Sequence, residues 1–169
     1  MLLLLHMFKY HWKNKEANFG KPVKLQVKGG THITFELMLM YQNKYIALRR
    51  DNIPQHEPKS NNKQKLYFCH GLIRYGESVE KCIQRIIREQ TGVAVKSFRV
   101  VYIDSQVQKK DGQWAITPHA FVHLKNKPTP GVYGNKISEV IEFTKHKVPK
   151  DFAFWSSKEL LEFINEFDI

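Results

Sequence analysis

The residues of this sequence that could act together in chemistry are concentrated between Gly71 and Val93. This segment carries Glu77, Arg85 and Glu89, and the spacing of its apolar residues predicts a helix from Ser78 to Thr91. Residues three and four apart on a helix share a face. Carboxylates on such a face could bind divalent cations, which neutralise phosphate charge and activate water. The segment is therefore the first place in the sequence to look for a candidate metal site.

Two adjacent arginines, Arg49 and Arg50, stand at the end of a predicted strand and could bind phosphate bidentately through their guanidinium groups. Aromatic residues that could stack on a nucleobase follow at Tyr102, Trp114 and Phe121. Side chains alternate between the two faces of a strand, so about half of such aromatics face the core. We expect a core position for Phe121.

The segment GLIRYGESVEKCIQRIIREQTGV resembles the Nudix box, which reads G, five residues, E, seven residues and REUXEEXGU, where U is a bulky aliphatic residue. Ile86 and Gln90 replace two glutamates of this pattern. The other fixed positions match, namely Gly71, Glu77, Arg85, Ile87, Glu89, Gly92 and Val93. The predicted strand, turn, helix and closing glycine agree with the loop-helix-loop of the family. Outside the box the resemblance extends over roughly residues 33–167 and includes the late aromatic segment FWSSKELLEF.

The resemblance implies a metal-dependent hydrolase that acts on a nucleoside diphosphate linked to another moiety. Its cofactor would be Mg²⁺ or Mn²⁺, bound by Glu89, Gln90 and the backbone carbonyl of His70. Glu77 and Arg85 would form an internal ion pair that steadies the loop against the helix. The family pattern has glycine where this sequence has His70, which we interpret as a local substitution rather than a new ligand.

The resemblance also suggests where further site residues lie. The predicted catalytic set is Glu89, Arg85, Glu77 and Glu142, and the predicted substrate-binding set is Arg49, Arg50 and Gly71. Nudix enzymes often recruit a base from a later loop or strand, and Glu142 and Glu139 lie in a suitable region. The alternative is that both are solvent-facing strand residues.

Ile86 and Gln90 weaken the expectation of catalysis. Ile86 supplies no oxygen and extends the apolar stripe of Val79, Cys82 and Ile83, so a structural role is favoured there. Gln90 offers a carbonyl oxygen but no charge, which lowers affinity for hard cations. Ile86 is thus the residue on which the functional interpretation depends.

These residues would be positioned by a Nudix-type α/β/α sandwich, an α/β (α+β) fold with a mixed sheet, the loop-helix-loop of the box and a C-terminal helix. A turn at Gln42 and Asn43 is expected to use the left-handed backbone that Asn tolerates. The polar segment 51–65 is expected to be a surface loop. Predicted strands span residues 23–27, 33–41, 44–49, 66–69, 95–103, 114–124 and 139–143, and predicted helices span 78–91 and 156–167.

Composition indicates one globular domain over residues 1–169, with 1–20 as an N-terminal extension or edge strand. Lys and Arg number 27 against 16 for Asp and Glu, and the net charge of +11 favours anionic partners such as nucleotides, phosphorylated metabolites or RNA. Two cysteines cannot build a disulfide framework, and the apolar run at Met1 is too short to span a membrane. We therefore expect a cytoplasmic protein, translated from Met1 or Met7.

Two functions of different classes stay open. The first is a divergent, weakened Nudix hydrolase. The second is a catalytically inactive Nudix module that binds a nucleotide or RNA without metal. A scaffolding role through the 51–65 loop has no positive signature.

Overall fold

The computed structural model describes residues 31–50, 65–74, 76–107, 114–132 and 136–168. The predicted strand at 23–27, the 1–20 extension and nearly all of the 51–65 loop lie outside the described residues. The described strands are β1 (Thr31–Tyr41), β2 (Lys44–Arg50), β3 (Leu66–Tyr67), β4 (Cys69–Leu72), β5 (Val95–Val107), β6 (Trp114–Leu124) and β7 (Ile137–Phe143), and the described helices are α3 (Val79–Thr91) and α4 (Ser157–Phe167).

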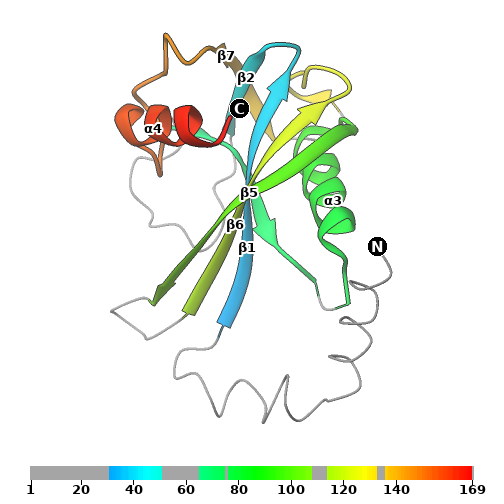
Figure 1. Cartoon of the computed structure of the whole chain (residues 1–169). Helices are drawn as coiled ribbons and strands as arrows, with labels where there is room; N and C mark the ends of the chain where they lie inside the picture. The colour runs from blue at the N-terminus through cyan, green and yellow to red at the C-terminus, as the bar shows by residue number, and fades with distance from the viewer. Residues whose placement is uncertain (1–30, 51–64, 75, 108–113, 133–135, 169) are drawn as a thin grey trace, which may run out of the picture. The chain divides into compact units, whose positions relative to one another are not determined.

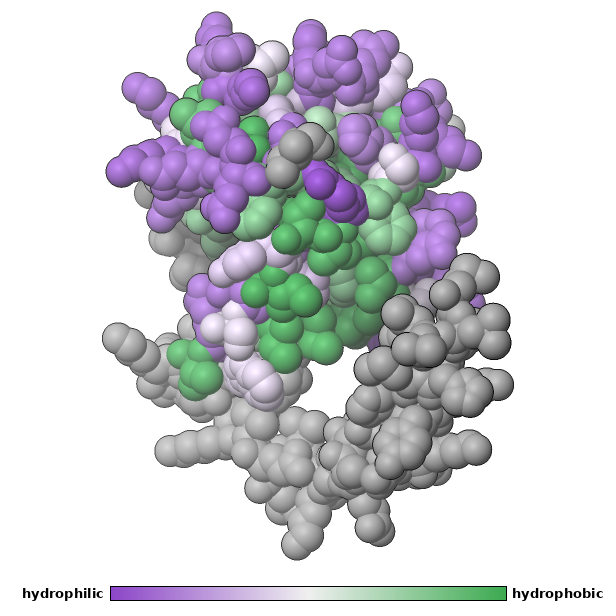
Figure 2. Space-filling model, viewed as in Figure 1, coloured by the Kyte–Doolittle hydropathy of each residue, from purple (hydrophilic) through white to green (hydrophobic). Residues whose placement is uncertain are grey.

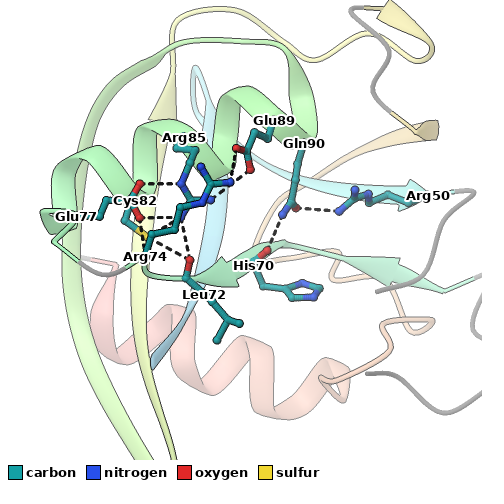
Figure 3. Close-up of polar contacts among 9 residues, drawn as sticks. All are labelled: Arg50, His70, Leu72, Arg74, Glu77, Cys82, Arg85, Glu89 and Gln90. Atoms are coloured by element: carbon teal, nitrogen blue, oxygen red, sulfur yellow. Dashed lines mark hydrogen bonds and ion pairs between the residues drawn. The ribbon is translucent and has the colours of Figure 1, made fainter. Parts of the chain in front are cut away.

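The strands form one seven-stranded sheet in the order β3-β2-β1-β6-β5, with β4 paired to β1 and β7 paired to β2. Strand β1 pairs with β2 at its end, where Leu39 lies opposite Ile46, and with β4 at its beginning, where Glu36 lies opposite His70. Two different strands thus pair with the two halves of β1. Where these two pairings of β1 adjoin, the end of β2 and the middle of β4 both form hydrogen bonds with α3 (Figures 1 and 3).

Each face of the sheet has its own core. Alternate residues of β1 point to opposite faces, so Leu37 and Leu39 pack with the buried face of α3, whereas Met38 and Met40 pack with α4. The two helices lie on different sides of the sheet in Figure 1. The predicted α/β/α arrangement with a mixed sheet is confirmed.

Local sequence signals explain where the helices begin and end. Ser78 caps α3 by accepting a hydrogen bond from the Lys81 amide, and Gly92 ends the helix with a left-handed backbone at φ 75°. Ser156 begins α4 in a reciprocal capping box with Glu159. The predicted helices agree with the structure, apart from the capping serines.

Three expectations need correction in detail. The predicted strand 66–69 is two strands, because β3 pairs with β2 and β4 pairs with β1. Strand β5 runs to Val107 rather than ending at 103. The left-handed turn residue is Gln42, with φ 55°, and not Asn43. A two-residue hairpin turn can place its left-handed residue first, as here, so the identity of Asn43 does not decide the position.

The surface of the described residues has a polar region next to an apolar area. Figure 2 shows hydrophobic residues at the centre of the visible face, with hydrophilic side chains above them. Strand β5 contributes exposed hydrophobic side chains at Val100, Tyr102 and Ile103. Contacts divide the chain into two compact units, one of residues 33–104 and 117–169 and one of residues 1–32 and 105–116. No helix in the described part of the chain is long and apolar enough to cross a membrane.

Candidate functional site: the face of helix α3 and strand β4

A hydrogen-bonded chain joins the end of β2, helix α3 and strand β4 (Figure 3). Arg50 Nη1 donates to Gln90 Oε1 at 2.9 Å, and Gln90 Nε2 donates to the backbone carbonyl of His70 at 2.5 Å. The carbonyl that the family resemblance assigns to a metal therefore accepts from a side-chain amide. Only an amide can make both bonds, since an ionised carboxylate has no proton to donate.

The predicted ion pair between Glu77 and Arg85 is present. Arg85 donates from Nε and Nη2 to the two oxygens of Glu77, both at 2.7 Å, and both side chains are largely buried. Arg85 Nη2 also donates to the Leu72 carbonyl at 2.8 Å. The hydrogen bonds from Arg85, supported by one from the Arg74 amide, lower the pKa of Glu77 to about 2. This bidentate pair fixes the turn before α3 against the helix.

Glu89 lies one helical turn beyond Arg85 and is shared by two arginines. Arg74 Nη2 donates to Glu89 Oε1 at 3.0 Å, and Arg85 Nη1 donates to Oε2 at 3.2 Å. The Glu89 side chain is 50% exposed and that of Arg74 is 65% exposed, so solvent screens these pairs. Both carboxylate oxygens nevertheless have a guanidinium partner.

Ile86 belongs to the core, as its apolar character predicts. Its side chain is 1% exposed and packs in the cluster between α3 and the sheet. A Cβ atom built at Gly71 would lie 3.1 Å from Ile86 Cγ1, so Gly71 permits the close approach of β4 to α3. At position 86, where the family pattern has a glutamate, this protein thus has a buried hydrocarbon side chain.

The donor set of this face does not fit a divalent cation in the observed arrangement. Magnesium prefers anionic and carbonyl oxygens. Here the Glu89 oxygens are held by arginines, the His70 carbonyl is held by Gln90, and Ile86 has no oxygen. Among the described residues, no group of three or more His, Cys, Asp or Glu side chains could hold a metal ion.

Some predicted site residues lie away from this face. Arg49 donates to Glu139 at 2.7 Å and to Asp151 at 2.8 Å, so it does not join Arg50 in a clamp. Glu142 is held by Lys44 and Lys127, which together lower its pKa to about 2.

The sheet register explains why Glu142 is remote from the box. Glu142 lies opposite Ile46 on β2, four residues before Arg50. At about 3.3 Å per residue, that separation is roughly 13 Å along the strand. No described contact links Glu142 to the box residues, and its role as a base stays a prediction.

The aromatic candidates also separate. Phe121 is 2% exposed in the core beside α4, as expected. Tyr102 packs against Phe163 and Phe167 of α4. Trp114 donates to Ser105 at 2.8 Å. None of these described contacts reaches the box, so stacking of a base on them is not supported by position.

Sequence reasoning missed Arg74 and an aromatic group beside His70. Arg74 falls in the five unspecified residues between Gly71 and Glu77, where the pattern assigns no role. The His70 ring lies edge-on to Phe154, 6.1 Å between centroids. The only signal in the sequence was a cationic residue three positions before Glu77.

The chain belongs to the Nudix family, because the model of the NUDIX domain matches residues 32–163. This match and the fold confirm the resemblance seen in the box. A comparison with curated protein sequences finds no match.

Similar solved structures have the same fold. A MutT Nudix hydrolase from Burkholderia pseudomallei is 15% identical with a TM-score of 0.59, covering 78% of this chain and 96% of that chain. A MutT/nudix family protein from Enterococcus faecalis is 17% identical with a TM-score of 0.58, covering 94% and 73%. A pyrophosphohydrolase from Bacillus subtilis is 14% identical with a TM-score of 0.51, covering 73% and 68%. At these identities the likeness shows the fold alone.

Proposed function

We propose that this Nudix domain binds a nucleoside diphosphate linked to another moiety and is catalytically inactive. The ligand class follows from family membership and from the cationic groups at the site, Arg50 and Arg74. The excess of basic residues over the whole sequence also favours an anionic ligand.

One observation carries the proposal. Gln90 donates its amide to the His70 carbonyl and accepts a hydrogen bond from Arg50. These bonds occupy the His70 carbonyl oxygen and the Gln90 side-chain oxygen, both of which a metal site would need free. Ile86, buried beneath them, cannot act as a base or a ligand. Binding of phosphate groups needs only the cationic side chains that remain.

The test compares turnover in wild-type protein and Glu89→Gln. A panel of compounds in which a nucleoside diphosphate is esterified to a sugar, a nucleoside or an alkyl group is incubated with Mg²⁺ or Mn²⁺, and products are followed by ³¹P NMR. We expect the same background rate for both proteins, together with ligand-induced stabilisation of the wild type in thermal melts. Metal-dependent turnover that Glu89→Gln abolishes would reject the loss of catalysis.

A second candidate, a weakened metal-dependent hydrolase, is favoured by Glu89. This carboxylate is half exposed on the open side of α3, and solvent-screened arginines could release it to a cation. A similar structure is named a pyrophosphohydrolase. The Glu89→Gln comparison separates the two candidates, because only the hydrolase depends on this carboxylate.

RNA is a further ligand suggested by the net charge of +11. Binding to many phosphates of an RNA strand would weaken steeply with salt, whereas a single diphosphate would show a shallow dependence. Titration of both ligands at two salt concentrations distinguishes them. We expect the shallow dependence, because the cationic groups described at the site are few.

A cytoplasmic location also stays a prediction.

A further inference from the structure

Guanidinium groups are bonded to the side chains at two positions that the Nudix pattern gives to metal ligands. Glu89 bonds Arg74 and Arg85, and Gln90 bonds Arg50 (Figure 3). Arg85 belongs to the family pattern, whereas Arg50 and Arg74 add cationic groups beside residues that in that pattern would bind a divalent cation. Unlike a metal ion, a guanidinium group is supplied by the chain itself, and it is always charged.

The residues of this cluster carry a net positive charge. Figure 3 draws three arginines, at 50, 74 and 85, and two glutamates, at 77 and 89, so these five side chains carry one net positive charge. Glutamates at 86 and 90, as in the family pattern, would give one net negative charge. A negative cluster must bind cations before it can accept a phosphate, whereas a positive cluster attracts the anion directly.

Arg50 has donor capacity that the described residues do not use. A guanidinium group has five N–H donors. Arg50 Nη1 is bound to Gln90, while its Nε is buried and has no hydrogen-bond acceptor within the described part of the chain. A buried donor without an acceptor is costly, so an anionic ligand that displaced the atoms covering Nε would satisfy a group that the described structure leaves unsatisfied.

Arg74 provides a second, accessible guanidinium. It lies in the turn before α3 and is held by Glu89 with 65% of its side chain exposed. Glu89 is itself fixed from the other side by Arg85. Arg74 can therefore bind an incoming phosphate while Glu89 limits the positions that its side chain adopts.

Resting on the function proposed above, we propose that Arg50 and Arg74 bind the phosphate groups of the ligand directly and replace the divalent cation, so that the species recognised is the metal-free diphosphate. Gln90 and Glu89 are then positioning residues for these two arginines. Divalent cations compete for the ligand in solution instead of helping it to bind.

The experiment is calorimetric titration of the full chain with inorganic pyrophosphate, once in EDTA and once with excess Mg²⁺. We expect saturable binding in EDTA that does not strengthen with Mg²⁺. Arg50→Gln and Arg74→Gln should each weaken binding by about tenfold or more, since each removes charge-assisted hydrogen bonds. Arg88→Gln is the matched control, because Arg88 is exposed on α3, carries the same charge as Arg50 and Arg74, and lies outside the cluster.

Several outcomes would overturn the inference. Pyrophosphate binding that requires Mg²⁺, or affinities of the Arg50 and Arg74 variants equal to that of Arg88→Gln, would show that the arginines do not replace the metal. The proposed binding function would survive either result. It fails separately if neither pyrophosphate nor any compound of the nucleotide panel binds the wild type under either condition.

Two further comparisons keep the proposal testable if one variant fails to fold. Arg74 is mostly exposed, so Arg74→Gln carries the test if Arg50→Gln fails to fold by circular dichroism. Gln90→Glu should gain saturable Mn²⁺ binding that the wild type lacks, because it removes the amide donor and adds a carboxylate beside Glu89. Equal Mn²⁺ binding in both proteins would contradict the replacement of the metal.

Discussion

Single residues decide what the cluster on α3 can bind. Gln90 and glutamate have nearly the same shape, but the amide donates to the His70 carbonyl and the carboxylate would repel it. At position 86, where the family pattern has a charged glutamate, this protein has an isoleucine that is part of the core. Glu77 and Arg85 keep a bond that serves the fold with or without turnover.

The Glu77–Arg85 pair makes stability depend on acidity. The pKa of Glu77 is lowered to about 2, so its contribution is present above the ordinary glutamate pKa and is lost as pH falls from about 4.5 towards 2. We expect the melting temperatures of the wild type and Glu77→Gln to differ at pH 6, and this difference to be much smaller at pH 2.5, just above the folded-state pKa of Glu77.

The control for this prediction is Glu80→Gln, which changes an exposed carboxylate in the first turn of α3, three residues after Glu77. Its melting temperature should stay parallel to that of the wild type across the same range. A constant gap between Glu77→Gln and wild type from pH 6 to 2.5 would contradict the assigned pKa.

The site could be predicted from sequence only where spacing determines contact. Glu77 and Arg85 were expected to pair because the box fixes both positions, and they do. Arg74 lies in an unspecified stretch, so its bond to Glu89 had no signal. The hydrogen-bond donation by Gln90 depends on which backbone carbonyl β4 presents to the helix, and a one-dimensional pattern does not contain that information.

At the scale of elements, α3 serves both as a wall of the core and as the support of the cluster. Its buried stripe, Cys82, Ile83, Ile86 and Ile87, packs on the sheet, while Glu89 projects from the exposed side. A residue at position 86 must therefore pack in the core, and this requirement comes before any role in binding or catalysis.

Restoring a glutamate at position 86 should destabilise the protein. Ile86→Glu buries an ionisable group against Gly71 and should lower the free energy of unfolding by about 3 kcal/mol or more. Ile86→Val should cost only about 1 kcal/mol. Urea denaturation followed by tryptophan fluorescence measures both. Equal stability of Ile86→Glu and wild type would mean that the side chain can turn to solvent.

Elements with strong periodicity were predictable, and those defined by pairing were not. Both helices follow from their apolar stripes and serine caps. The division of residues 66–72 into β3 and β4 depends on which neighbour each half pairs with, and both halves read as one apolar run. The end of β5 at Val107 likewise depends on its partner strand rather than on its own residues.

At the scale of the whole molecule, the core between α3 and the sheet encloses both cysteine thiols, which could otherwise react. Cys69 and Cys82 both lie in the core beneath α3 and are fully buried. Burial raises the pKa of Cys69 to about 12 and that of Cys82 to about 11. The nucleophilic thiolate is therefore scarce in the native protein.

We expect neither cysteine to react with a chromogenic disulfide reagent in the native protein at pH 8. In denaturant both thiols should react, which gives the matched control within one sample. Their pKa values return to the ordinary range once the core opens. Fast modification of either thiol under native conditions would contradict the burial of that side chain.

The bond from Gln90 to the His70 carbonyl also has a consequence for the chemical ageing of the protein. Glutamine is a thermolabile residue, and hydrolysis of its side-chain amide releases ammonia and leaves a glutamate. At position 90 this deamidation would remove the donor to the carbonyl and place a second carboxylate beside Glu89. Old molecules would thus drift, without any mutation, towards the ligand set of a metal-binding Nudix box.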